Sequence, residues 1–305
     1  MCKEINSKDI LNKWEEELED RVFNVYLRDP FLEMNLLILR VGKRPETDLY
    51  VRNKIKKAEE LRIGVTVFEL PEDTTQAELN QYLMAADTPT ILQLPIPEHL
   101  NAEEAMSYLD PKWDVDGLTP TQKGKLVSDD EHALEPATAK GVIRILENEI
   151  SLRGKRVAIV SRSPLIGQPL AQMILQRDGV PTILHSRVSD HILRTIMKSS
   201  DVIVTGCGKR AIFDASYFDL KDQVIIDCSM AKDEDRPGVG DVDKEDVLLF
   251  SLNRIASGYG HTGPATVLGL MDNIIKCYEI LVGVRYFESV GFRENRRKEI
   301  NGYRR

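Results

Sequence analysis

The chain has 305 residues, of which 42% are apolar and 30% are charged, so it is neither a disordered nor a fibrous protein. Its 41 basic and 49 acidic side chains give a net charge of −8, which argues against nucleic acid or an anionic membrane surface as the main partner. Because a single hydrophobic core usually stops growing below this length, two domains are expected.

Four cysteines lie far apart in the sequence, at Cys2, Cys207, Cys228 and Cys277, and none forms a Cys-x-x-Cys pair. This pattern favours a reducing compartment and predicts no metal site. The first residues carry charges and lack the apolar stretch of a signal peptide, and no apolar run approaches the roughly 20 residues that span a bilayer. We therefore expect a cytoplasmic protein with no membrane contact.

Strands and helices are predicted to alternate in the first half of the chain. The expected elements are a helix over 9–24, strands at 36–41 and 65–70 flanking a helix over 46–62, a helix capped by Asp73 or Thr74 and ending at Ala86, and a strand at 90–94. Such alternation implies parallel strands joined by right-handed crossovers. The first half therefore indicates an α/β domain of about 130 residues.

A second alternating series follows a predicted helix over 138–150. It consists of a strand at 156–160, a helix over 168–177, and strands at 182–185, 202–205 and 223–227. This order is typical of a doubly wound nucleotide-binding sheet. Pro264 suits the first turn of a final helix over 264–282, and the basic tail after Phe292 is expected to be solvated.

The turn after the strand at 156–160 could hold a phosphate. It contains Ser161, Arg162 and Ser163 and leads through Gly167 into a helix, whose free N–H groups would point into the turn. The spacing is not Gly-x-Gly-x-x-Gly, so a plain strand-to-helix connection is the alternative.

The next strand ends in Ser186 and Arg187, where sheets that bind NAD place an acidic residue. A hydroxyl and a guanidinium suit a 2′-phosphate instead, and Arg162 and Arg187 would lie at the carboxyl ends of adjacent strands. This favours NADP over NAD as the cofactor. The alternative is two solvated arginines.

Tyr50 and Lys54 are four residues apart and so share one face of the predicted helix. The neighbouring apolar stripe, which includes Val51 and Ile55, places Lys54 near a wall of protein. A partly desolvated lysine beside a tyrosine hydroxyl can exchange protons near neutral pH. A solvated surface lysine is the alternative interpretation.

Gln93 ends an apolar strand and Asp116 lies in the segment Trp-Asp-Val-Asp-Gly-Leu. Each could simply form a hydrogen bond at a turn or a strand edge. Together with Lys54 they are more informative, because open α/β sheets bind ligands at the carboxyl ends of their strands.

The order of these motifs resembles the bifunctional methylenetetrahydrofolate dehydrogenase and methenyltetrahydrofolate cyclohydrolase family over about residues 36–280. The family motif Ser-x-x-Tyr-Val-x-x-Lys is matched by Thr47, Tyr50, Val51 and Lys54. The remaining matches are Gln93-Leu94-Pro95 with Pro97, Asp114 to Gly117, Arg162, Ser163, Gly167 and Pro169 of the phosphate turn, His185 to Arg187, Gly240 to Val242, and Gly263 to Thr266.

The resemblance implies a role for each matched residue. Lys54 would be the catalytic lysine, with Tyr50 bordering the substrate, Gln93 as the polar partner of the lysine and Asp116 anchoring the pterin. Gly263 and Pro264 would touch the substrate. The implied cofactor-binding residues are Ser161, Arg162, Ser163, Gly167, Ser186, Arg187, Gly206 and Gly208.

The implied reactions are the NADP-dependent oxidation of 5,10-methylenetetrahydrofolate and the hydrolysis of 5,10-methenyltetrahydrofolate to 10-formyltetrahydrofolate. The resemblance also implies a homodimer, with a folate-binding catalytic domain (1–137 plus 273–305), a Rossmann-like NADP-binding domain (138–272) and a cleft between them. Tetrahydrofolate derivatives are then the expected partners.

Departures from the family cluster on the cofactor side. Ser161 stands where the family has glycine, and the loop from Ser257 to Gly263 replaces two prolines and one glycine of the family with other residues. His261 in that loop is expected to be exposed. Three alternatives follow, namely a cyclohydrolase with impaired dehydrogenase activity, a binding protein without turnover, and another two-domain dehydrogenase acting on a small acid.

Overall fold

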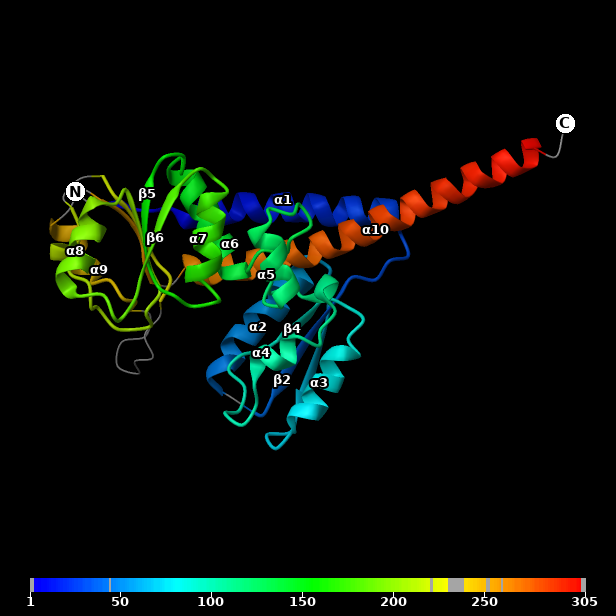
Figure 1. The fold of residues 1–305 in the computed structure, drawn as a ribbon, viewed down its shortest axis with the longest axis horizontal. Coiled ribbons are helices and arrows are strands. Elements are labelled where there is room, and N and C mark those ends of the chain that lie inside the picture. Colours follow the sequence, from blue (N-terminus) through cyan, green and yellow to red (C-terminus); the bar gives the residue numbers. More distant parts are fainter. Residues whose placement is uncertain are drawn as a thin grey trace.

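The computed structural model describes residues 3–43, 45–219, 222–229, 239–250, 253–258 and 260–302. Two units, each built around a parallel sheet, are joined by two long helices, α1 (Ser7–Arg28) and α10 (Thr262–Gly302). In Figure 1 the unit with the six-stranded sheet lies at the left end of these helices, and the unit with the three-stranded sheet lies below them. The expected two-domain α/β fold is therefore confirmed.

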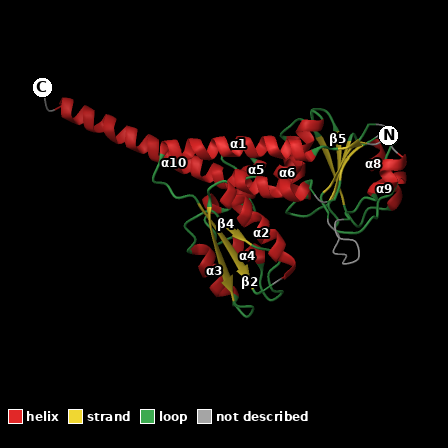
Figure 2. Cartoon of the chain, turned by 180° about the vertical axis from the view of Figure 1, so that it is seen from behind, coloured by secondary structure: helices red, strands yellow, loops and turns green. Residues whose placement is uncertain are grey.

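The first unit contains a three-stranded sheet in the order β3-β2-β4. Its parallel strands are β2 (Asn35–Val41), β3 (Gly64–Leu70) and β4 (Thr90–Leu92), and α2 (Pro45–Glu60) and α3 (Gln76–Met84) connect them. The central strand β2 is apolar because helices cover both of its faces (Figure 2). The chain then continues through α4 (Ala102–Met106), η1 (Pro111–Trp113) and α5 (Pro120–Val127).

The second unit contains a six-stranded sheet in the order β1-β9-β8-β7-β5-β6. Its elements are β1 (Lys3–Glu4), α6 (Ala137–Glu149), β5 (Arg156–Val160), α7 (Gly167–Leu175), β6 (Val180–Leu184), α8 (Asp190–Ser199), β7 (Val202–Thr205), η2 (Ala215–Tyr217), β8 (Val224–Asp227), α9 (Lys244–Phe250) and β9 (Arg254–Ala256). Strand β1 pairs with β9, so the amino-terminal residues belong to this sheet. Two residues are too few to show a strand pattern, which explains why the sequence did not predict β1.

The start of α3 differs from the expectation. Thr75, not Asp73 or Thr74, is its N-cap, because Thr75 and Glu78 form a reciprocal capping box. Thr74 instead donates its hydroxyl hydrogen bond to the carbonyl of Pro71. The sequence therefore located the helix but not its first residue.

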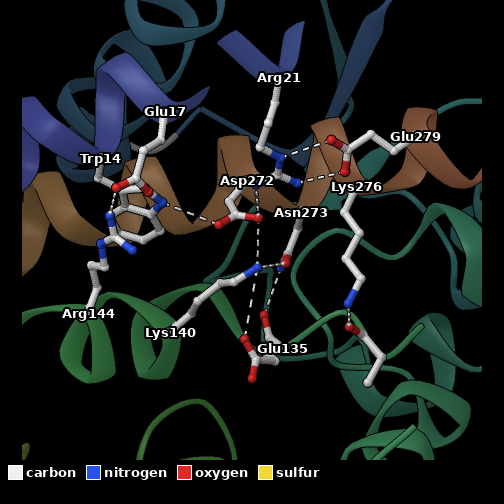
Figure 3. Close-up of polar contacts among 11 residues, drawn as sticks. Trp14, Glu17, Arg21, Glu135, Lys140, Arg144, Asp272, Asn273, Lys276 and Glu279 are labelled. Atoms are coloured by element: carbon white, nitrogen blue, oxygen red, sulfur yellow. Dashed lines mark hydrogen bonds and ion pairs between the residues drawn. The ribbon is translucent and has the colours of Figure 1, made fainter. Parts of the chain in front are cut away.

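Helices α1, α6 and α10 are joined by charged side chains as well as by apolar packing (Figure 3). Arg21 of α1 forms ion pairs with Asp272 at 3.0 Å and with Glu279 at 2.8 Å, both on α10. Lys140 of α6 reaches the same Asp272 at 3.0 Å. This cluster fixes the three helices that connect the two units.

Helix α10 continues to Gly302, well beyond the predicted end at residue 282, and its final turns project away from both units (Figure 1). The side chains of the basic tail after Phe292 lie outside the described residues, so their solvation stays a prediction. No helix in the described part of the chain is long and apolar enough to cross a membrane.

Candidate active site

A cavity of about 200 Å³ brings together three of the predicted catalytic residues. Lys54 comes from α2, Gln93 follows β4, and Asp116 lies in the loop before α5. The second unit contributes Leu165 to the same cavity, and α10 contributes Thr266. The sequence assigned neither side chain a role in the site, although Thr266 ends a family motif, because only the fold brings them to the cleft.

Lys54 is half-buried, and its Nζ donates a hydrogen bond to Oε1 of Gln93 at 3.0 Å. The Gln93 amide is fixed from its other end, because Nε2 donates to the carbonyl of Leu94 at 2.7 Å. Gln93 is 9% exposed, so little solvent competes for this contact. The ammonium group is therefore oriented into the cavity by an acceptor that cannot rotate freely.

The two acids of the Asp-Val-Asp segment have different roles. Asp114 is fully buried, and its Oδ2 accepts the backbone N–H of Thr119 at 2.6 Å. Burial raises the pKa of Asp114 to about 6. Asp116 instead lines the cavity, and its carboxylate accepts no hydrogen bond from the described residues. Burial raises the pKa of Asp116, and the nearby charge of Lys54 opposes that rise.

Asn273 of α10 holds the wall of the cavity in place (Figure 3). Its Nδ2 donates to the carbonyl of Val115 at 2.8 Å and to that of Glu135 at 2.7 Å. These two residues directly precede Asp116 and Pro136, which both line the cavity. Asn273 is fully buried, so it links the position of the first-unit loop to the long helix.

The other predicted substrate residues line a neighbouring groove of about 550 Å³ between α1, α2 and the start of α10. Tyr50, Gly263 and Pro264 lie in this groove and do not line the Lys54 cavity. Tyr50 is 44% exposed. Because Tyr50 and Lys54 are one helical turn apart, a ligand could extend from the cavity into the groove past the tyrosine ring.

The predicted phosphate turn lies between β5 and α7. A Cβ atom on Gly167 would lie 2.0 Å from the carbonyl oxygen of Ser161, so only glycine allows this close approach. The hydroxyl of Ser161 is turned inward and accepts the N–H of Ser163 at 3.3 Å. The N-cap residue of α7, Ile166, provides no side-chain cap, which suits an anion at this end of the helix.

Arg162 and Arg187 follow β5 and β6, which pair in parallel with Val160 opposite Leu184. Both arginines are exposed, and neither forms an ion pair with any described residue. Ser186 is also exposed at the end of β6. The two guanidinium groups thus start from the same edge of the sheet, as the sequence predicted, and suit a dianionic phosphate.

Buried carboxylates support the loop that contains Gly206 and Gly208. Asp241 accepts the N–H of Cys207 at 2.6 Å and that of Lys209 at 2.8 Å. Gly208 has a φ of +72°, which favours glycine. The sequence placed Asp241 in a family motif but gave no indication of its partners, which come from the loop after β7.

The loop from Ser257 to Gly263 contradicts one expectation. His261 is 7% exposed rather than solvated. Its ring contacts the amino-terminal segment, with Nδ1 2.7 Å from Oγ of Ser7 and Nε2 3.1 Å from Oε1 of Glu4. Sequence reasoning missed these contacts because their partners lie more than 250 residues away.

Comparison with known proteins identifies the family. The family model described as tetrahydrofolate dehydrogenase/cyclohydrolase, catalytic domain, matches residues 5–116, and the one for the NAD(P)-binding domain matches residues 136–281. The bifunctional protein FolD of Lactococcus lactis subsp. lactis is 34% identical over 280 residues, which cover 89% of this chain and 95% of that protein. The counterpart from Agathobacter rectalis is 32% identical and covers 90% of this chain and 99% of that protein.

Solved structures agree with the sequence comparisons. The bifunctional FolD enzyme of Campylobacter jejuni is 28% identical with a TM-score of 0.84, covering 92% of this chain and 99% of that one. The Trypanosoma brucei enzyme, solved with NADP and an inhibitor, is 25% identical with the same TM-score, covering 92% and 98%. The expected enzyme class and the NADP cofactor are confirmed. The chain therefore belongs to the tetrahydrofolate dehydrogenase/cyclohydrolase family.

Proposed function

We propose that the Lys54 cavity is where this chain oxidises 5,10-methylenetetrahydrofolate with NADP and hydrolyses the resulting 5,10-methenyltetrahydrofolate. The contact between Lys54 and Gln93 in a cleft that also contains Asp116 carries this proposal. A protein that only binds folate has no need of a lysine oriented in this way. The family membership supports both reactions.

Asp116 orients the folate. Its carboxylate has lone pairs that no described residue uses, and it can accept hydrogen bonds from the amino group and a ring N–H of a pterin. The one-carbon bridge then lies near Lys54, while the rest of the folate passes Tyr50 toward Gly263 and Pro264 in the groove. The predicted substrate residues are divided between the Lys54 cavity and the groove. This division fits a long ligand that has one end in each.

Oxidation needs little acid or base catalysis. The lone pairs of the two nitrogen atoms beside the one-carbon bridge stabilise the cation that remains when hydride leaves. NADP, when bound, supplies the hydride acceptor. The protein residues hold donor and acceptor in contact and exclude water, and such positioning accounts for most of the rate.

Hydrolysis needs proton transfers. Water loses a proton as it attacks the methenyl carbon, and a ring nitrogen gains one as the ring opens. We assign both transfers to Nζ of Lys54, which takes one proton from water as the C–O bond forms and returns it to nitrogen as the C–N bond breaks. The remaining hydroxyl proton leaves to solvent as the formyl carbonyl forms. Gln93 keeps Nζ oriented between these two positions.

The residues around the phosphate turn suit NADP. The diphosphate group would bind at the uncapped end of α7, where Gly167 lies close to the backbone of Ser161. The 2′-phosphate would bind to Arg162, Ser186 and Arg187. Gly206 and Gly208 leave room for the cofactor beside the loop after β7.

We also propose the domain boundaries, the compartment and the assembly. A catalytic unit of residues 1–137 and 273–305, whose first strand β1 pairs into the other sheet, and a cofactor unit of 138–272 would enclose the folate. The chain would act in the cytoplasm as a homodimer. The open edge strand β6 supports a dimer, because Val180 is 52% and Ile183 38% exposed there. Light scattering should give a mass twice that of one chain. In the Ile183→Lys variant the measured mass should fall to that of a single chain.

Two separate assays of the purified protein test the proposed reactions. One follows NADPH formation from 5,10-methylenetetrahydrofolate, and the other follows the disappearance of 5,10-methenyltetrahydrofolate. Both activities are expected. Hydrolysis alone would mean that the altered loop has removed hydride transfer, and the absence of both would leave only a binding protein.

A further inference from the structure

His261 joins two parts of the chain that meet beside the candidate active site. It directly precedes α10, and its ring lies against the amino-terminal segment through Ser7 and Glu4. Ser7 is 1% exposed, so the contact is dry on that side. The two ring nitrogens thus contact both partners at once, with Nδ1 against the Ser7 hydroxyl and Nε2 against the Glu4 carboxylate.

Glu4 is itself fixed. Its Oε1 accepts a hydrogen bond from Nζ of Lys244 at 2.6 Å, and its backbone lies in β1, which pairs with β9. The acceptor that contacts His261 is therefore attached to the six-stranded sheet by its main chain and to the start of α9 by its side chain.

The loop before α10 is held at both ends. At its start, Oγ of Ser257 donates to Oδ2 of Asp227 at 3.0 Å, and Ser257 is 3% exposed. At its end stands His261. Between them, Gly258 and Gly260 have φ values of +88° and +91°, in the region that favours glycine. The two buried side chains thus define the course of the loop.

This loop and the first turns of α10 form one side of the site. Gly258, Gly260, Gly263 and Pro264 line the groove, and Thr266 lines the Lys54 cavity. A shift of the amino-terminal end of α10 would therefore move the surfaces around both hollows at once.

We propose that His261 is a positioning residue for hydride transfer, which it supports by holding the loop and the first turn of α10 against Ser7 and Glu4. The proposal rests on the proposed role of the Lys54 cavity. Glu4 and Ser7 line neither the groove nor the Lys54 cavity. Through His261, these two residues would still contribute to the reaction.

Hydride transfer is the step that depends most on this arrangement. It requires direct contact between two carbon atoms, and a displacement of about 1 Å from the reactive geometry can cost a hundredfold in rate. Hydrolysis depends on Lys54 and on water, which can adjust to a displaced surface. Loss of the His261 contacts should therefore separate the two activities.

The test compares both activities in His261→Ala, His261→Asn and His261→Gln with those in wild type. In His261→Ala we expect kcat for NADPH formation to fall about ten- to hundredfold while hydrolysis stays within about threefold. An asparagine oxygen can replace Nδ1 toward Ser7, and a glutamine nitrogen can replace Nε2 toward Glu4, so each should restore part of the lost rate. His132→Ala, at an exposed histidine, is the matched control.

A second comparison separates positioning from a general loss of folding. Ser7→Ala should reduce NADPH formation in wild type but should add little in the His261→Ala background, because the contact is already lost. Thermal unfolding checks that each variant is folded. Equal losses of both activities, or unchanged NADPH formation in folded His261→Ala, would overturn the proposal while leaving the two-reaction function of the wild-type protein intact.

Discussion

The Lys54 cavity and the loop that precedes α10 lie next to each other but are built in different ways. The cavity presents side chains with unused hydrogen-bonding capacity, such as the carboxylate of Asp116, which accepts nothing from the described residues. The loop instead uses its polar side chains internally, since Ser257 and His261 are both buried and bonded.

This difference separates reacting groups from supporting groups. A polar side chain that lines a cavity and lacks a protein partner is available to a ligand, whereas a buried polar side chain with two partners fixes the backbone. His261 looks like an exposed loop residue in the sequence, yet its contacts make it a support. Lys54 looks like one of several surface lysines, yet its contact with Gln93 supports the proposal that it is the reacting group.

Replacing Lys54 with methionine tests the reacting group most severely. Without Nζ no side chain remains to move protons at the methenyl carbon, so hydrolysis should fall by about 10²- to 10⁴-fold. Folate binding should be largely kept, because Asp116 is unchanged. Stopped-flow absorbance and equilibrium titration give the two quantities, with Lys198→Met on the exposed face of α8 as the control.

An unchanged hydrolysis rate in Lys54→Met would remove the lysine from the mechanism. A large loss of folate binding would instead make Lys54 a binding group.

Asp114→Asn distinguishes the buried acid from the acid in the cavity. The pKa of Asp114 in the folded protein, about 6, is above its ordinary value of 3.8, so the folded state holds this proton more tightly than the unfolded state does. Stability should therefore fall by about 2 kcal/mol as the pH rises from 4 to 7, and the Asn variant should lose this dependence. Urea unfolding across that range measures it.

The side-chain amide of Asn can still accept the Thr119 N–H, so the fold should survive the substitution. The same pH dependence in Asp114→Asn would show that another group causes it.

Lys140→Met tests the cluster that connects both regions through α6 and α10 (Figure 3). Lys140 and Asp272 are only 14% and 13% exposed, so loss of the ammonium leaves a largely buried carboxylate with Arg21 as its ion partner. We expect the free energy of unfolding to fall by about 2 kcal/mol. In the exposed control Lys13→Met it should change by less than about 0.5 kcal/mol. Urea unfolding of both variants measures these free energies. An equal change in the free energy of unfolding in both variants would show that the cluster adds no stability.

Arg187→Ala should have the smallest effect and addresses the cofactor side. Loss of one guanidinium from the 2′-phosphate should raise the KM for NADP about tenfold and leave the weaker use of NAD nearly unchanged. Initial rates with each cofactor test this, and Arg153→Ala, at an 83% exposed side chain, is the control. Equal losses with NADP and NAD would remove Arg187 from the recognition of the phosphate.

The sequence was sufficient for features that depend on local pattern. Strands β2 to β8 and helix α2, with Tyr50 and Lys54 on it, follow from periodicity, and the strand-end positions of Gln93, Arg162 and Arg187 follow from element order. It was insufficient where partners are distant in the chain. The two-residue strand β1 and the contact of His261 with Ser7 have no local pattern, because the fold alone creates them.

The most direct test of the account is a crystal structure with NADP and a folate analogue bound together. We expect the pterin to bind the carboxylate of Asp116, Nζ of Lys54 to lie within hydrogen-bond distance of the one-carbon position, and the 2′-phosphate to lie between Arg162 and Arg187. An analogue bound outside the cleft, or a Lys54 side chain directed into bulk solvent with both ligands in place, would contradict it.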